Sequence, residues 1–288
     1  MPTLDPDRRS LLVAWNRGMA AMHALFAIAT LATADMGMRF PLYRPAYSVV
    51  RPGGGGGGGE ADAYSTWVQA RSLEPDGHYL YVAWCALAFS ALSAGFHLAN
   101  AQLWRSWYLS NISDARCPAR WVEYALSAPL QAVCIAYLTG STTTDSVVSV
   151  FVLVSTTMFF GHLTEDASRP DGEEGWTRPP TERLVPHLLG YVPFLAAVGI
   201  ILQGFARASG VSAVVDGEER SMPSFVYAIV TSQLLLFTSF TFVQLAATLR
   251  APKWYVQGEI AYMVLSLVAK GILSFLLLTN VIALQFFA

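Results

Sequence analysis

The strongest constraint on the fold of this chain is a series of seven long apolar segments. They cover residues 11–34, 78–103, 120–140, 145–163, 184–206, 223–249 and 258–286. An α-helix rises about 1.5 Å per residue, so each segment is long enough to cross the roughly 30 Å hydrocarbon core of a bilayer. Turn-forming residues such as Gly, Pro, Asn and Asp mark the breaks between them. We therefore predict an all-α membrane protein, a bundle of seven transmembrane helices.

The composition agrees with a bilayer environment and excludes some partners. Charged residues make up 13% of the chain and apolar residues 54%, whereas about a quarter of the residues in a soluble protein are charged. The net charge is −2 and the Lys and Arg residues do not cluster, so we expect no nucleic-acid partner. The three cysteines give neither a disulfide framework nor a metal-binding spacing. The expected partners are the lipid bilayer and either a small ligand or another membrane protein.

The first apolar segment has an alternative interpretation as a cleavable signal peptide. Arg8-Arg9, an apolar run and Ala32-Thr33-Ala34 follow one another in the order that such peptides use. The apolar run is longer than the usual core of roughly 7–15 residues, and it contains His23. We therefore predict that this segment is the first helix of the bundle.

A long polar loop is predicted between the first two segments, over residues 35–77. Its centre is an unbroken glycine run, Gly53 to Gly59, which cannot pack a core and is typical of a linker. Behind the run, Tyr64, Trp67 and Val68 leave open a short strand or a lid over the bundle. Residues 1–288 are expected to form a single domain.

The distribution of basic residues predicts the orientation in the membrane. If the N-terminus is cytoplasmic, eleven basic residues fall on the inner side and six on the outer side, four of these in the long first loop. Short cytoplasmic loops carry the excess of Lys and Arg in membrane proteins. We therefore expect a multi-pass protein, in the cell membrane, with a cytoplasmic N-terminus and an extracellular C-terminus.

Lys270 is the residue of greatest chemical interest. It is one of only two lysines and lies about twelve residues into the last segment, near the bilayer centre. An ammonium at that depth must be paired, solvated in a cavity or chemically removed, and a desolvated lysine is the more nucleophilic amine. The alternative is a lysine that extends to an interface. Its depth from both ends disfavours this alternative, and Schiff-base formation with an aldehyde ligand is one use of such a lysine.

A protonated Schiff base is a buried cation and needs an anion beside it. Glu123 is the best-placed carboxylate, near the inner end of the third segment. The alternative is an interfacial glutamate that pairs with Arg120 at the start of that helix.

Two histidines lie within the predicted membrane segments. His23 is in the first segment and His97 in the second, and with the assigned orientation both are on or near the cytoplasmic side of Lys270. Imidazoles accept or hold a proton near neutral pH, so the pair could line a polar cavity. The alternative is that each ring simply hydrogen-bonds within a helix interface.

Two stretches resemble a known family. Residues 120–127, Arg-Trp-Val-Glu-Tyr-Ala-Leu-Ser, and residues 261–270, Ala-Tyr-Met-Val-Leu-Ser-Leu-Val-Ala-Lys, closely resemble helices three and seven of heliorhodopsins. Asn16-Arg17 with His23, residues 92–97 and Ser239-Phe240 with Val243-Gln244 add support. The likeness covers all of the chain except the long first loop and the loop tips.

The resemblance implies all-trans retinal as the cofactor, bound to Lys270, with Glu123 as the sole counterion. It also implies an inverted membrane orientation, a dimer with an outer lid, and a cytoplasmic polar cavity at His23 and His97. The remaining expected neighbours of the chromophore are Ser93, Ser127, Tyr124 and Ser266, and its ring contacts are Phe194, Phe237 and Phe240.

Function is expected to be light sensing without enzymatic activity and without ion pumping. A proton pump needs titratable groups on both sides of the Schiff base, whereas here they fall level with Lys270 or on its cytoplasmic side. A passive light-gated channel is the alternative, because waters along Ser127, Gln131 and Thr139 could bridge the outer half. No loop resembles a signalling domain, so the signalling partner is not identified.

Overall fold

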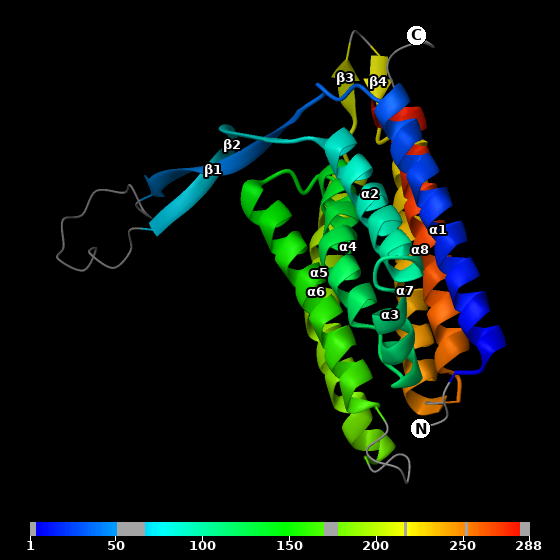
Figure 1. The fold of residues 1–288 in the computed structure, drawn as a ribbon. Coiled ribbons are helices and arrows are strands. Elements are labelled where there is room, and N and C mark those ends of the chain that lie inside the picture. The colour runs from blue at the N-terminus through cyan, green and yellow to red at the C-terminus, as the bar shows by residue number, and fades with distance from the viewer. Residues whose placement is uncertain (1–3, 51–66, 170–177, 216–217, 251–252, 283–288) are drawn as a thin grey trace, which may run out of the picture.

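The computed structural model describes residues 4–50, 67–169, 178–215, 218–250 and 253–282. This part of the chain is mostly helical and forms an elongated bundle (Figure 1). Its helices are α1 (Pro6–Thr33), α2 (Val82–Ala101), α3 (Arg105–Ser113), α4 (Pro118–Leu138), α5 (Thr144–Ala167), α6 (Pro180–Ser209), α7 (Ser224–Arg250) and α8 (Tyr255–Leu277). A short π-helix, Leu278–Ile282, continues α8.

Seven of these helices have 20 to 30 residues, and each coincides with one predicted apolar segment. Six of them, all except α4, are long and apolar enough to cross a membrane. α4 packs against α2, α5, α6 and α7, and 14 of its 21 residues are buried. Polar residues can therefore lie on α4 without facing lipid, and α4 carries the predicted counterion.

The predicted first helix is an integral part of the bundle. α1 packs against α2 and α8, and it buries Leu12, Asn16, Met19 and His23 among other residues. Asp5 caps its start by accepting a hydrogen bond from the backbone of Arg8 at 2.8 Å. These contacts fit the interpretation as a bundle helix rather than a signal peptide.

The long first loop differs from the prediction, because much of it is a β-hairpin. β1 (Phe40–Val50) pairs antiparallel with β2 (Trp67–Leu80), and α2 begins at Val82 rather than near residue 78. Trp67 and Val68 belong to β2, as the strand alternative had it, whereas Tyr64 and the glycine run lie outside the described residues. Aromatic and β-branched residues along β1 favour this pairing. The hairpin projects to one side at the end of the bundle opposite the N-terminus (Figure 1).

The hairpin is tied to the helices by polar contacts near its base. The Tyr43 backbone N–H donates to the Thr142 carbonyl at 3.1 Å, and the Tyr137 hydroxyl donates to the Pro41 carbonyl at 2.7 Å. The Thr144 hydroxyl donates to Asp76, and this hydrogen bond holds the pKa of the exposed Asp76 carboxyl below its ordinary value. A second small hairpin, β3 (Ala213–Val215) with β4 (Glu218–Arg220), joins α6 to α7.

α3 is a further element that the sequence pattern did not predict. It fills the connection between the second and third long helices and buries Tyr108 and Ile112 against the bundle. Small residues elsewhere allow close helix packing: Ala83 and Ala86 on α2 and Ala132 and Ala136 on α4 are fully buried. Large apolar side chains such as Leu188, Val192 and Leu195 on α6 point outward, as expected for a surface in contact with lipid.

Candidate functional site

Lys270 is buried on α8 with only 2% of its surface exposed. Its Nζ lies 2.6 Å from Glu123 Oε1, 2.6 Å from Ser93 Oγ and 3.1 Å from Ser266 Oγ. Ser266 precedes Lys270 by four residues, so both side chains lie on one face of α8. The three donor hydrogens of the ammonium therefore each have an acceptor, which a buried cation requires.

Glu123 provides the negative charge, and α4 directs it at the lysine. Its Oε1 accepts hydrogen bonds from Ser93 Oγ at 2.6 Å and from Ser127 Oγ at 2.7 Å, in addition to Lys270. Ser127 is one turn further along α4, and Ser93 comes from α2. Three helices thus hold one buried ion pair at a fixed position.

Tyr124 completes this group as a wall of the site. Its ring centroid lies 5.4 Å from Lys270 Nζ, and its hydroxyl donates to the Tyr262 carbonyl at 3.0 Å. A cation near an aromatic face is attracted to the ring. The structure therefore brings together six of the predicted site residues: Lys270, Glu123, Ser93, Ser127, Ser266 and Tyr124.

The two predicted histidines stack on each other beside this group. The rings of His23 and His97 are parallel within 5°, with centroids 5.7 Å apart. His97 Nδ1 lies 2.9 Å from Asn16 Oδ1, while both ring nitrogens of the buried His23 have no partner among the described residues. Buried imidazole nitrogens without protein partners are suited to ordered water.

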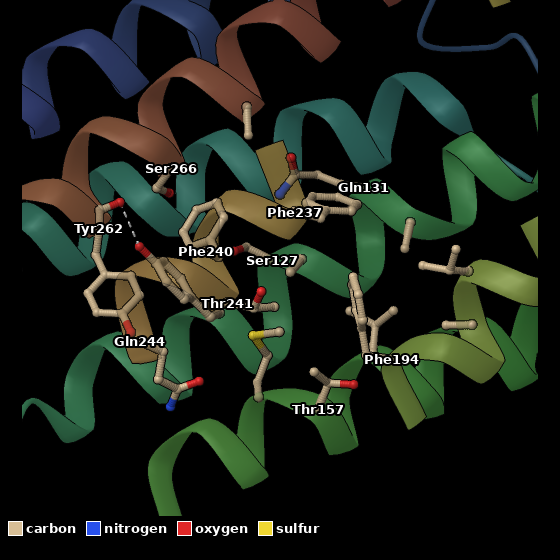
Figure 2. A pocket seen from close by; sticks show the side chains of 18 of the residues that line it. Ser127, Gln131, Thr157, Phe194, Phe237, Phe240, Thr241, Gln244, Tyr262 and Ser266 are labelled. Carbon is tan, nitrogen blue, oxygen red and sulfur yellow. Dashed lines mark hydrogen bonds between the residues drawn. The ribbon is translucent and has the colours of Figure 1, made fainter. Parts of the chain in front are cut away.

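A large apolar cavity adjoins Lys270 on the other side. It encloses about 910 Å³ including the space at its mouth, and Lys270, Ser266, Tyr124 and Ser127 form part of its wall. Phe194 from α6 and Phe237 and Phe240 from α7 also belong to its wall, as predicted from the sequence (Figure 2). A mostly apolar cavity with one amine at its wall is suited to an elongated apolar aldehyde.

The sequence matches the heliorhodopsin family model over residues 12–282, which is nearly the whole chain. The chain belongs to the heliorhodopsin family. Membership implies a retinal chromophore and an integral membrane protein, and the apolar cavity beside Lys270 fits that group. No curated protein matches the sequence.

Solved structures with a similar fold are microbial rhodopsins. A thermophilic rhodopsin has a TM-score of 0.59 at 12% identity, and the match covers 96% of this chain and 94% of that one. A light-driven proton pump from Leptosphaeria maculans has the same TM-score at 15% identity, covering 96% and 97%. A proton-pumping rhodopsin from the marine alga Acetabularia acetabulum has a TM-score of 0.54 at 13% identity, covering 97% and 98%. At these identities the likeness shows the fold alone.

One buried charge cluster of this heliorhodopsin was missed by the sequence analysis. Arg120 does not pair with Glu123, as the alternative interpretation had it, but donates to both Glu165 on α5 and Glu259 on α8. All three side chains are more than nine-tenths buried. Their positions in the sequence were the available signal. Glu165 lies two residues beyond the fourth apolar segment and Glu259 at the start of the seventh, both at the end of the bundle where Arg120 lies.

Proposed function

We propose that this heliorhodopsin is a light-sensing photoreceptor that carries all-trans retinal as a protonated Schiff base on Lys270, with Glu123 as counterion. The observation that carries the proposal is the 2.6 Å contact between Lys270 Nζ and Glu123 Oε1 at the wall of the apolar cavity. When bound, retinal supplies absorption of visible light and an isomerisation that drives a slow conformational cycle.

Glu123 balances the positive charge at the nitrogen of Lys270. A buried cation without an anion loses its proton, because desolvation disfavours the charged form. Ser93 and Ser127 orient the carboxylate and share its charge through hydrogen bonds. Ser266, on the turn before Lys270, accepts a hydrogen bond from the amine at 3.1 Å. Among the described residues Lys270 pairs with no carboxylate besides Glu123, so Glu123 carries the counterion role alone.

Phe194, Phe237 and Phe240 are proposed to shape the part of the cavity farther from Lys270. Aromatic side chains present large rigid apolar surfaces, which exclude water and restrict an apolar ligand to one orientation. These walls would make the reactive end of the ligand meet Lys270 and its other end meet the rings.

Sensing rather than pumping is proposed because the titratable groups near Lys270 lie level with it or on its cytoplasmic side. Asn16 lies in the first half of α1 and His97 near the end of α2, on the side of the bundle that holds the N-terminus, and His23 stacks on His97. Beyond Lys270, residues 271–282 contain no ionisable side chain. A proton that leaves the site therefore has acceptors in the histidine region and returns from there.

We further propose a single domain of seven membrane-spanning helices, with α4 as the third span and the N-terminus in the cytoplasm of a cell-membrane protein. A homodimer, a signalling partner that docks on helices or short loops, and the absence of enzymatic activity complete the proposal. The unequal distribution of basic residues between the two sides supports the orientation.

A passive light-gated channel is the second candidate. Gln131 lies on α4 beyond Ser127, and its buried Oε1 has no partner among the described residues. A buried carbonyl of this kind binds water, and such a water would extend the polar groups past Lys270. This observation favours conduction in an open intermediate over active transport.

The deciding experiment combines spectra and photocurrents. The full chain is expressed with all-trans retinal, and its absorption is compared with that of Lys270→Ala and of Lys253→Ala, the matched control at the other lysine. We expect a visible pigment in the wild type and in the control only. Under voltage clamp, silence supports the sensor, current that reverses with the proton gradient supports the channel, and current against the gradient would contradict both.

A further inference from the structure

The cluster of Arg120, Glu165 and Glu259 contains two carboxylates and one guanidinium. Arg120 donates through Nη2 to Glu165 and through Nη1 to Glu259. The three side chains are 3–6% exposed. If both carboxylates were ionised, the cluster would carry one uncompensated negative charge in a buried environment, which is costly. Two acids that share a site in this way are expected to hold one proton between them.

The hydrogen bonds indicate which carboxyl is ionised. Glu165 accepts from four donors: Arg120, the Tyr255 hydroxyl at 2.6 Å, the Trp121 indole at 2.8 Å and the Cys117 backbone N–H at 2.7 Å. Each of these groups has a hydrogen directed at the carboxylate, so a proton on Glu165 would oppose one of them. Glu165 is therefore the ionised partner of Arg120.

Glu259 has a much poorer set of donors. Among the described residues, its only donor besides Arg120 is the Tyr108 hydroxyl, at the long distance of 3.3 Å. A carboxylate with few donors is less stabilised in a buried site than one with four. The proton that the cluster requires is thus best placed on Glu259.

Glu259 also shares a cavity with Glu123, the proposed counterion. It lines one small cavity together with Glu123 and His97, and a second small cavity together with Glu165. Asn16 donates its amide to the Leu12 carbonyl, so its oxygen faces His97 Nδ1 and accepts a hydrogen there. His97 Nε2 then has a free lone pair that can accept a proton.

Other charged and titratable groups around Glu259 do not supply a second cation to it. In the described part of the chain, Arg116 forms no ion pair with either carboxylate, and Arg183 on α6 donates to the Thr248 carbonyl and lines neither small cavity. Asp166 and His162 on α5 face each other at 3.6 Å and are partly exposed. The groups that face the cluster from the packed helices are Tyr108 on α3, Cys117 before α4, Tyr255 and Tyr262 on α8, and His97 on α2.

We propose that Glu259 is a neutral carboxylic acid that stores a proton beside the Glu123 cavity. Glu165 and Arg120 form the permanent ion pair, and Arg120 also donates to the Glu259 carboxyl. When the proton leaves, the O–H bond of Glu259 breaks and an N–H bond forms at His97 Nε2, either directly or through water in the shared cavity. Glu259 is then a carboxylate held by Arg120, and the return of the proton restores the resting state.

Infrared spectroscopy of the retinal-free protein tests the resting state. At about pH 8 exposed Asp and Glu side chains are ionised, so a carboxylic acid C=O band reports a buried protonated group. We expect this band in the wild type, its loss in Glu259→Gln, and its retention in the matched control Glu123→Gln. A wild-type spectrum without the band, or a band that survives in Glu259→Gln, would overturn the proposal.

Thermal unfolding of the same samples locates the proton within the pair. Gln mimics a protonated Glu, so Glu259→Gln should unfold within a few degrees of the wild type. In Glu165→Gln an amide NH2 replaces one carboxylate oxygen and opposes two of the four donors, so this variant should unfold at a clearly lower temperature. The reverse order of stability would place the proton on Glu165 and refute the assignment. Neither measurement needs retinal, so a failure here is distinguishable from a failure of the proposed photoreceptor function.

Discussion

The two buried charge centres of this heliorhodopsin lie on the same helices and differ in chemistry. Glu123 follows Arg120 by three residues on α4, and Lys270 follows Glu259 by eleven residues, about three turns, on α8. The Lys270 centre has one cation, one anion and three serine hydroxyls, and it opens onto a large apolar cavity. The Arg120 centre has two carboxylates, aromatic donors and only small cavities.

The difference between the two centres follows from the chemistry of their cations. A lysine can lose its proton and form a covalent bond, whereas a guanidinium remains charged and offers a rigid planar set of donors. Lys270 lies at the wall of the large apolar cavity. The unreactive cation joins α4, α5 and α8 at the end of the bundle near the N-terminus. Breaking each centre should therefore give a different kind of loss.

The largest effect is expected from Lys270→Ala. The variant should lose all visible absorption with retinal, because the other lysine, Lys253, lies outside the buried site. It should still fold, since the removal of the cation leaves Glu123 free to become protonated. Absorption spectra after retinal addition and thermal unfolding of the retinal-free protein check the two parts. A pigment in Lys270→Ala would remove the basis for the covalent site.

The next effect is a loss of stability from Arg120→Gln. Removal of one partner of a buried ion pair costs about 3–5 kcal/mol, because an unpaired charge remains in a low-dielectric environment. Here Glu165 would be left with three neutral donors, and the ring contact of Arg120 with Tyr262 at 4.2 Å would also be lost. The free energy of unfolding of the retinal-free protein measures the effect.

Arg44→Gln is the matched control for this loss. Arg44 pairs with Glu74 at 2.9 Å on the exposed hairpin, and exposed pairs contribute about 0–1 kcal/mol. If the two substitutions cost the same, the Arg120 centre does not support the bundle in the way described above.

Glu123→Gln should change the pigment more than the fold. Without the fixed anion, the positive charge is no longer localised near Lys270. The absorption of the protonated Schiff base should therefore move to longer wavelength. Loss of the anion should also make the Schiff base give up its proton at a lower pH than in the wild type. A pH titration of the visible spectrum measures both. If neither property moves, another group serves as counterion.

The sequence predicted these regions unequally, for physical reasons. Long apolar runs have only one stable arrangement in a bilayer, so seven helices were predicted. Their ends lie within five residues of the observed ones except at the end of α8, which stops at Leu277 and is followed by the π-helix Leu278–Ile282, whereas the prediction ran to residue 286. The meeting of Lys270 with Glu123 followed from the cost of an unpaired buried charge. The roles of these residues stay predictions, although the contacts among them are observed.

The Arg120 centre and the hairpin show where sequence reasoning failed. Glu165 and Glu259 lie at the ends of apolar segments, where an exposed carboxylate is equally common, and only the packing of α5 and α8 against α4 reveals their shared partner. β1 and β2 are separated by the glycine run, so their pairing is a long-range contact that no local pattern encodes. α3 is too short for an apolar period to identify it.

The smallest effect is expected from Ser127→Ala, which sharpens the description of the Lys270 centre. Ser127 supplies one of three hydrogen bonds to Glu123 Oε1, and the donors from Lys270 and Ser93 remain after its removal. The carboxylate should hold the positive charge slightly less firmly, so the pigment should form normally and absorb at a wavelength between those of the wild type and Glu123→Gln. Ser155→Ala is the matched control, because the Ser155 hydroxyl on α5 donates to the Ala125 carbonyl and, among the described residues, forms no hydrogen bond with Glu123. A shift as large as that of Glu123→Gln would mean that Ser127 positions the counterion almost alone, and equal spectra for the two serine variants would mean that the Ser127 hydrogen bond does not reach the chromophore.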